Sequence, residues 1–354
     1  MSIQDFLAAI AVVINGLPQA LLALTYGFAA FPTALAFLVG SAGMLVFGQV
    51  APISFQAESI VMAGTLGRDR NERLNIVFFT GVVMAILGAL GILELITGFI
   101  GTPILNAMMA GVGVTLAKTA VDMIKADPLA GGVSLGVALV VYFFTADLIY
   151  TIILSVVISS ILWAIVNRKK IAENPVPVNL DHERFQLLKF HVTPRLIRNV
   201  LALCTLQVGG NIAYAGITGG LAEQAVNVDF VTIYSGIGDA ISALFGGGPV
   251  EAIISGTAVA PSPVISGILM MLILAAILLT KTLPRIAKFV PSQCIGGFLF
   301  VMGAIVVFPD NAVSALQQAP VVAGVTTIVT ATTDPFIGML AGIVVRALTS
   351  VLGG

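Results

Sequence analysis

The chain has 354 residues, of which 58% are hydrophobic and only 9% are charged, and its formal net charge is −1. A soluble domain carries about a quarter charged residues, so the mean hydropathy of +1.08 excludes a soluble globular protein and indicates an integral membrane protein. The near-zero net charge argues against nucleic acid as a partner.

Apolar runs follow one another through the first part of the chain. Most are close to the length of about 20 residues that crosses a bilayer, and short polar or glycine-containing breaks separate them. The third run is the exception, because it is only about half that length. We expect seven segments here, over residues 6–31, 33–48, 52–66, 74–97, 103–124, 129–146 and 148–166.

One long polar stretch, residues 167–198, then separates this part from a second set of apolar runs. We expect seven further segments, over residues 199–222, 228–245, 249–260, 262–280, 289–308, 312–331 and 335–352. Because seven is odd, the halves insert with opposite orientation, which is the inverted-repeat architecture of secondary transporters. The sequence therefore predicts an all-α polytopic membrane protein with 14 transmembrane segments, as repeats 1–166 and 199–354 joined by the polar linker.

The third segment of each half is short and interrupted in a similar way. Pro52–Thr65 and Pro249–Thr257 each contain a proline, a glutamate (Glu58 or Glu251) and a Gly-Thr pair. We expect two half-helices, the second with Pro249 at its first helical position. Their N-termini carry unpaired N–H groups and the positive end of the helix dipole. Such paired broken segments are the best sequence pointer to a transporter binding site.

Buried polar side chains supply the candidate ligand contacts. A charge at the middle of the membrane costs roughly 2.5–3.5 kcal/mol on insertion scales, so Glu58 and Glu251 are candidates for binding a ligand N–H or for carrying a coupling proton; the alternative is a structural carboxylate. Gln207 and Asn211 are one helical turn apart, and Gln19 follows a proline break. These amides could bind a hydrogen-bonding solute or hold helices together.

The basic residues of the loops gather on one predicted face, and the other face is almost free of lysine and arginine. They follow segments three, five, seven and eleven, and outside the linker these loop residues are Arg68, Arg70, Arg73, Lys125, Lys281, Arg285 and Lys288. The positive-inside rule makes that face cytoplasmic and places both termini outside, in a protein of the plasma (cell inner) membrane. No nucleotide-binding loop, zinc spacing or Ser-His-Asp order is present, so we expect no cofactor, no metal, no coupling to ATP and no enzymatic activity.

The first half resembles the nucleobase/ascorbate transporter family, which includes the xanthine and uracil permeases. The third segment of that family carries a Ser-Phe pair after a short extended strand, and Ser54-Phe55 matches it. A glutamine in the first helix of the family is matched by Gln19.

The second half matches the same family less closely. The family's eighth segment carries a glutamate and, four residues on, a histidine, and these positions look like Gln207 and Asn211. Phe245–Pro249 matches the Phe-Gly-x-x-Pro that begins the tenth segment. The position of the family's next glutamate looks like Ser255, with Glu251 one turn earlier.

The resemblance implies a division into two domains. A core domain would comprise segments one to four and eight to eleven, about 1–97 and 199–280, and a gate domain the rest, about 98–166 and 289–354. It also implies short strands before both half-helices, elevator-like motion and a homodimer. The family's termini are cytoplasmic, whereas the distribution of basic residues in this chain places the termini outside. The expected substrate-binding residues are Gln19, Ser54, Phe55, Gln56, Glu58, Gln207, Asn211, Val250, Glu251 and Ser255.

The expected function is secondary active transport of a small polar solute across the lipid bilayer. A purine or pyrimidine nucleobase, coupled to H⁺ or Na⁺, is the main hypothesis. The alternative is an anion transporter of the same fold, similar to the sulfate permeases. An amide at Gln207 in place of an acidic ligand favours this alternative, whereas the two glutamates in the half-helices count against it.

Overall fold

The computed structural model describes residues 2–168, 184–283 and 291–352. Within these ranges, eight helices are long and apolar enough to cross a membrane. The expectation of an all-helical, multi-pass membrane protein is therefore confirmed. Most of the predicted linker, residues 169–183, and the loop with Arg285 and Lys288 lie outside the described residues.

The elements of the first half follow the apolar runs. They are α1 (Ile3–Thr25), α2 (Ala30–Phe47), strand β1 (Ile53–Ser54), α3 (Ala57–Leu66), α4 (Arg70–Ala89), α5 (Ile92–Ala126), α6 (Pro128–Thr145) and α7 (Leu148–Val166). Aspartates explain two of the starts: Asp127 accepts the backbone N–H groups of the first turn of α6, and Asp147 does the same for α7. Such caps satisfy N–H groups that have no partner within the helix.

The second half is more irregular. It contains α9 (Pro194–Leu221), α10 (Val228–Leu244), strand β2 (Glu251–Ala252), the 3₁₀-helix η2 (Gly256–Val259), α11 (Pro263–Leu279), the 3₁₀-helix η3 (Ser292–Ile295), α13 (Gly296–Phe300), the π-helix η4 (Val301–Val307), α14 (Phe308–Gln318), α15 (Pro320–Thr332) and α16 (Pro335–Leu352).

The predicted boundary between segments 289–308 and 312–331 is wrong. The helical path continues through Pro309 and ends at Gln318, so that residues 293–318 form one long apolar helix. The π-helical turn Val301–Val307 precedes the proline, and such a widened turn accommodates a residue that cannot join the regular hydrogen-bond ladder.

Two short strands bring the broken segments of the two halves together. β1 and β2 pair antiparallel, with Ile53 opposite Ala252 and Ser54 opposite Glu251. The two stretches that look alike in the sequence are therefore in direct contact, although almost 200 residues separate them.

The second predicted half-helix is absent from residues 249–260, which form β2 and the short 3₁₀-helix η2. In this extended stretch, side-chain oxygen atoms accept hydrogen bonds from the backbone N–H groups. The Val250 N–H donates to Asp239 at 2.6 Å, and the Ala252 N–H donates to the Asn211 side-chain oxygen at 3.2 Å. Because these N–H groups are already hydrogen-bonded, the stretch can remain extended and does not have to form a helix to satisfy them.

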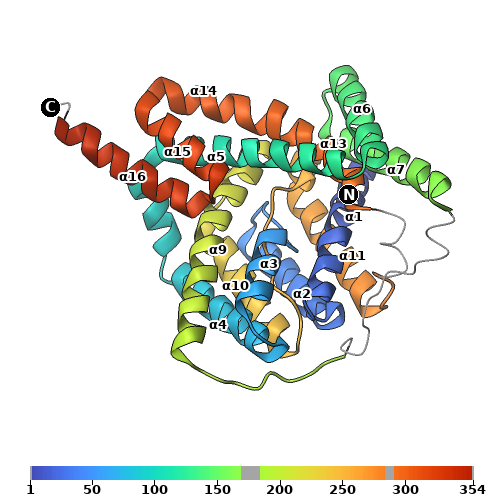
Figure 1. The fold of residues 1–354 in the computed structure, drawn as a ribbon, viewed down its shortest axis with the longest axis horizontal. Coiled ribbons are helices and arrows are strands. Elements are labelled where there is room, and N and C mark those ends of the chain that lie inside the picture. The colour runs from blue at the N-terminus through green and yellow to red at the C-terminus, as the bar shows by residue number, and fades with distance from the viewer. Residues whose placement is uncertain (1, 169–183, 284–290, 353–354) are drawn as a thin grey trace.

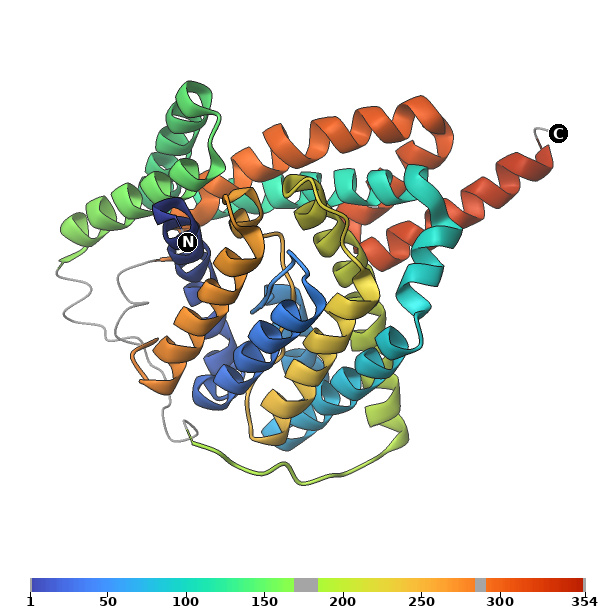
Figure 2. The ribbon, with the colours of Figure 1, turned by 180° about the vertical axis from the view of Figure 1, so that it is seen from behind.

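The helices form two groups that lie on opposite sides of the molecule (Figures 1 and 2). The first helix group contains α1–α4 and α9–α11, with β1 and β2 among them. The second helix group contains most of α5 together with α6, α7 and α13–α16. Each group combines segments from both halves of the chain, as an interleaved repeat requires.

Loops of the first helix group meet at one end through Arg70. Its guanidinium donates to the Gly27 and Gly246 carbonyl oxygens and to the Gln186 side chain, at 2.6–3.0 Å. These contacts join the loops after α1, before α4 and after α10 to the end of the predicted linker. Three loops expected on one face, those after the predicted first, third and ninth segments, therefore lie together with part of the linker.

Helix α5 belongs to both helix groups. Its start is fastened to α10, because Asp229 accepts the N–H groups of Leu93 and Glu94 at 2.9 and 3.1 Å while Glu94 accepts the Val228 N–H at 2.7 Å. Gly101, at φ +71°, then breaks the helix. Beyond this kink, α5 runs along α14 and α15.

Arg346 of α16 binds the backbone at this kink. Its guanidinium donates to the Ile100 carbonyl at 2.7 Å and to the Phe99 carbonyl at 3.0 Å, and it lies 5.2 Å from the centre of the Phe99 ring. The break would otherwise leave these carbonyl groups without helical partners.

We therefore expect Arg346→Met to destabilise the folded protein by about 1–3 kcal/mol, since hydrogen bonds from a charged donor are lost. The midpoint of thermal unfolding in detergent measures the effect. Arg198→Met, at an exposed position of α9, is the matched control and should leave the midpoint unchanged. Equal midpoints for both variants would show that Arg346 does not support the kink.

Candidate functional site

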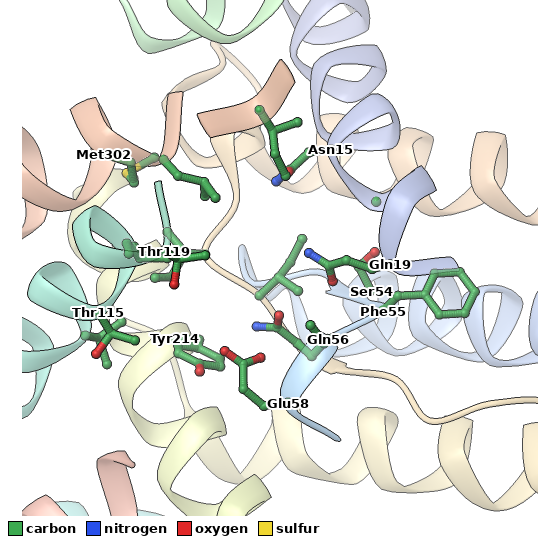
Figure 3. Close-up of a pocket in the computed structure, with 18 of the residues that line it drawn as sticks. Asn15, Gln19, Ser54, Phe55, Gln56, Glu58, Thr115, Thr119, Tyr214 and Met302 are labelled. Atoms are coloured by element: carbon green, nitrogen blue, oxygen red, sulfur yellow. The ribbon is translucent and has the colours of Figure 1, made fainter. Parts of the chain in front are cut away.

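A cavity of about 450 Å³ lies between the two helix groups (Figure 3). The first group contributes residues of α1, β1, the start of α3, α9 and the segment after β2. The second group contributes residues of α5, η3, α13, η4, α15 and the start of α16. The cavity is therefore bounded by both halves of the chain and by both helix groups.

Unpaired polar atoms mark the wall formed by α1 and β1. Asn15 Oδ1, Gln19 Oε1 and Ser54 Oγ are buried and have no hydrogen-bond partner among the described residues. In Figure 3, Gln19 and Ser54 lie side by side and Asn15 lies farther along the same helix. Because buried polar groups are nearly always paired, such a cluster beside a cavity indicates a place for a polar ligand. Asn15 was not predicted, although its spacing of four residues from Gln19 places both on one helical face.

The N-terminus of α3 opens on the same cavity. Gln56 is its N-cap residue, and no side chain caps the first turn. Glu58, in that first turn, is exposed, and the space beside it is the cavity. The turn combines free backbone donors, the positive end of the helix dipole and one carboxylate.

The opposite wall is polar as well. Thr115 and Thr119 of α5 face the α1 side across the cavity in Figure 3. Asp334 lines the cavity at the start of α16, where it also accepts the Ile337 N–H at 2.9 Å. Tyr214 of α9 lies beside Glu58. The sequence alone did not identify these four lining residues, because nothing in their local pattern shows which helix face meets the other group.

Glu251 lies behind the cavity wall. Its side chain is 1% exposed and accepts a hydrogen bond from the Ser59 hydroxyl of α3 at 2.7 Å. It thereby links β2 to the first turn of α3, one residue from Glu58. It does not belong to the described cavity lining.

Gln207 and Asn211 also lie outside the described lining. The Gln207 amide donates to Asp239 at 2.8 Å, and the Asn211 amide lies 3.2–3.3 Å from the hydroxyl groups of Thr232 and Ser235. Both amides join α9 to α10. Asp239 is fully buried in this network.

The remaining predicted residues, Phe55, Val250 and Ser255, direct their side chains towards other residues of the protein and not into the cavity. The Phe55 backbone borders the cavity, but its ring is turned away from it and packs edge-on against Phe37. Val250 is fully buried beside Asp239, and the Ser255 hydroxyl pairs with that of Thr257 at 2.7 Å. The structure thus gathers half of the ten predicted residues at the cavity, namely Gln19, Ser54, Phe55, Gln56 and Glu58.

Sequence comparison yields no relatives: no protein family matches the chain, and neither does any curated protein. Its fold, in contrast, is known. The transmembrane domain of BicA, a bicarbonate transporter of a cyanobacterium, superimposes with a TM-score of 0.60 at 14% sequence identity, over 96% of this chain and 97% of that domain.

Two structures of SLC26A9 are also similar. One has a TM-score of 0.61 at 13% identity and covers 99% of this chain and 65% of SLC26A9. The murine protein, an anion transporter in an inward-facing state, has a TM-score of 0.57 at 13% identity and covers 99% and 68%. This chain therefore spans about two thirds of the length of SLC26A9 and shares the fold of these transporters.

The resemblance to the nucleobase/ascorbate transporter family is wrong, because the structural neighbours are anion transporters. The broken third segment preceded by a strand, which suggested that family, is present in this chain although its structural neighbours are anion transporters. Transport of a xanthine- or uracil-type substrate is therefore not supported.

Proposed function

We propose that this chain is a secondary active transporter of a small anion of the sulfate, bicarbonate or carboxylate type. The observation that carries the proposal is the cavity between the two helix groups, where unpaired polar atoms of α1 and β1 meet the uncapped N-terminus of α3. Free N–H groups at a helix N-terminus bind anions. BicA and SLC26A9, which share the fold, are described as a bicarbonate and an anion transporter.

In this proposal the first helix group is the core domain and the second is the gate domain. Substrate would bind at their boundary and move by elevator-type alternating access, in a 14-segment arrangement of two inverted repeats with α3 as the half-helix. Coupling to H⁺ or Na⁺ and assembly as a homodimer belong to the proposal as well. The basic loops gathered around Arg70 support a cytoplasmic face at that end, in the cell inner membrane.

Within the cavity, the proposed substrate contacts are Asn15, Gln19, Ser54, Gln56 and the first turn of α3. Amide and hydroxyl groups would donate to the anion's oxygen atoms alongside the free backbone N–H groups. Gln207, Asn211, Val250, Glu251 and Ser255 would act from behind the wall, by holding β2 and α3 in place.

Thermal unfolding of the purified chain against a solute library tests the proposal. A ligand that binds only the folded state stabilises it by RT ln(1 + [L]/Kd), which is about 2.7 kcal/mol at a hundredfold excess over Kd. Sulfate, bicarbonate or oxalate should raise the unfolding midpoint, and uracil and xanthine should not. A shift caused by the bases alone would contradict the proposal.

Ser54→Ala separates a ligand contact from a structural one. The Ser54 hydroxyl is buried without a partner, so its removal should stabilise the unliganded protein by about 1 kcal/mol and should reduce the shift caused by the anion. Both effects are read in the same unfolding experiment.

The control for Ser54→Ala is Ser134→Ala. The Ser134 hydroxyl is buried but paired, because it donates to the Cys294 carbonyl and accepts the Gly297 N–H. Its loss should destabilise the protein without changing the anion shift. If Ser54→Ala behaved in the same way as Ser134→Ala, Ser54 would be a structural residue.

A further inference from the structure

The acidic side chains that line the cavity would repel an anion that entered without a cation. Glu58 lines it from the first helix group and Asp334 from the second, whereas the described lining residues include no lysine, arginine or histidine. An anion bound there would meet two carboxylates in a small space, with no basic side chain beside it. Like charges at such short range repel strongly where solvent is limited.

Glu58 differs from the acidic side chains of Asp334 and Glu251 in its partners, because among the described residues its carboxylate accepts only its own backbone N–H. Asp334 accepts a backbone N–H in its role as a helix cap, and Glu251 accepts the Ser59 hydroxyl. No hydrogen bond from another residue's side chain to Glu58 is present in the described part of the chain. Its carboxylate also sits in the first turn of α3, at the helix end that would attract the anion.

Among the residues that the structure describes, none near Glu58 supplies a compensating positive charge. Tyr214 faces it from α9, Glu251 lies behind it on β2, and Asp334 stands at the start of α16. The nearby polar side chains of α1 and α5 are neutral amides and hydroxyls. From α4, Arg73 binds the Gly67 carbonyl at the opposite end of α3.

We infer that the anion binds together with one proton, which Glu58 holds, so that an anion and a proton cross the membrane as one unit. Protonation converts Glu58 from a competitor for the α3 N-terminus into a hydrogen-bond donor towards the anion. It also removes one of the two negative charges that line the cavity. This inference rests on the proposed function, since it names the coupling ion and its carrier.

Purified protein in liposomes, with labelled sulfate and labelled oxalate as probes, separates transport from coupling. Both anions stay fully ionised at neutral pH. Counterflow at equal pH on the two sides measures transport alone, and uptake driven by an inward proton gradient measures coupling. For the wild type we expect gradient-driven accumulation, and an apparent affinity that weakens about tenfold per pH unit in the alkaline range, as binding of one proton requires.

In Glu58→Gln, the proton gradient should no longer drive accumulation, and the apparent affinity should no longer depend on pH. Glu223→Gln, at an exposed carboxylate beyond the end of α9, is the control and should behave as the wild type does. Asp334→Asn tests the opposite wall and should retain gradient-driven accumulation.

Three results would overturn the inference: a wild-type affinity that does not depend on pH, accumulation driven by a sodium gradient instead, or loss of coupling in Asp334→Asn but not in Glu58→Gln. The first measurement does not depend on any variant being folded. Absence of wild-type counterflow for both anions would instead be a failure of the proposed transport function, and it would remove the coupling with it.

Discussion

Replacing Gly81 by valine is expected to prevent the chain from accumulating as a folded protein. Gly81 lies in α4 where this helix crosses α10. A Cβ atom at this position would stand 2.5 Å from the Gly236 carbonyl oxygen and 2.6 Å from the Ala240 nitrogen. The contact is reciprocal, since a Cβ atom at Gly236 would stand 2.6 Å from the Gly81 carbonyl oxygen.

Both obstacles are backbone atoms, which cannot move aside as a flexible side chain can. Overpacking of a tight core costs about 1–3 kcal/mol or more, and here the two helices themselves must separate. Close approach through small residues is how membrane helices associate. The same crossing carries Asp239, which holds β2 through the Val250 N–H, so separation of α4 and α10 would also disturb the wall behind the cavity.

Size-exclusion chromatography of the detergent extract measures the effect as loss of the monodisperse peak. Gly132→Val is the matched control, because a Cβ atom at Gly132 in α6 meets nothing within 4 Å and valine is a better helix former than glycine. This variant should elute as the wild type does. A normal peak for Gly81→Val would mean that α4 and α10 are not packed this closely.

Replacing Gly16 by valine is expected to abolish ligand binding while the fold is retained. Gly16 lines the cavity between Asn15 and the turn that carries Gln19. Its Cβ atom would lie 3.3 Å from Ser54 Oγ and 3.9 Å from the nearest Leu274 carbon atoms. The protein can adjust to this tight contact by a few tenths of an ångström, but the two methyl groups of valine have to enter the cavity.

The stabilisation by sulfate or oxalate in thermal unfolding should weaken by at least tenfold in apparent affinity, which corresponds to about 1.4 kcal/mol. Gly324→Val, at a position in α15 with nothing within 4 Å of its Cβ atom, should bind as the wild type does. Undiminished binding by Gly16→Val would place the ligand somewhere other than this cavity.

Composition and periodicity were sufficient to predict a membrane protein and the positions of most helices. They were also sufficient to predict that one segment is broken. Pro52–Thr65 does form a strand and a short helix beside a cavity, because the prolines and polar residues that mark it are local signals. The similar stretch Pro249–Thr257 does not form the second half-helix. Its backbone donors are taken by Asp239 and Asn211, which are contacts that only the folded chain brings together.

The candidate site shows the same limit. Gln19 and Glu58 could be predicted because a polar residue in an apolar segment needs an explanation, whereas Ser54 was predicted from the family resemblance. Gln207 satisfied the same criterion but is paired with Asp239, itself unrecognised as buried from the sequence. A polar residue in a membrane segment is therefore a ligand contact or a structural partner according to its neighbours on other helices.

The family assignment was wrong for a related reason. This chain contains a broken third segment with a strand before it, and it shares its fold with BicA and SLC26A9 at 13–14% sequence identity. Motifs that reflect architecture cannot distinguish families that use the same architecture.

Counterflow of labelled sulfate and oxalate into liposomes tests the central proposal, anion transport through the cavity between the helix groups, most directly. We expect time-dependent counterflow by the wild type that unlabelled anions inhibit and uracil does not, and that Gly16→Val abolishes. Counterflow no greater than in protein-free liposomes for both anions, or undiminished counterflow by folded Gly16→Val, would contradict it.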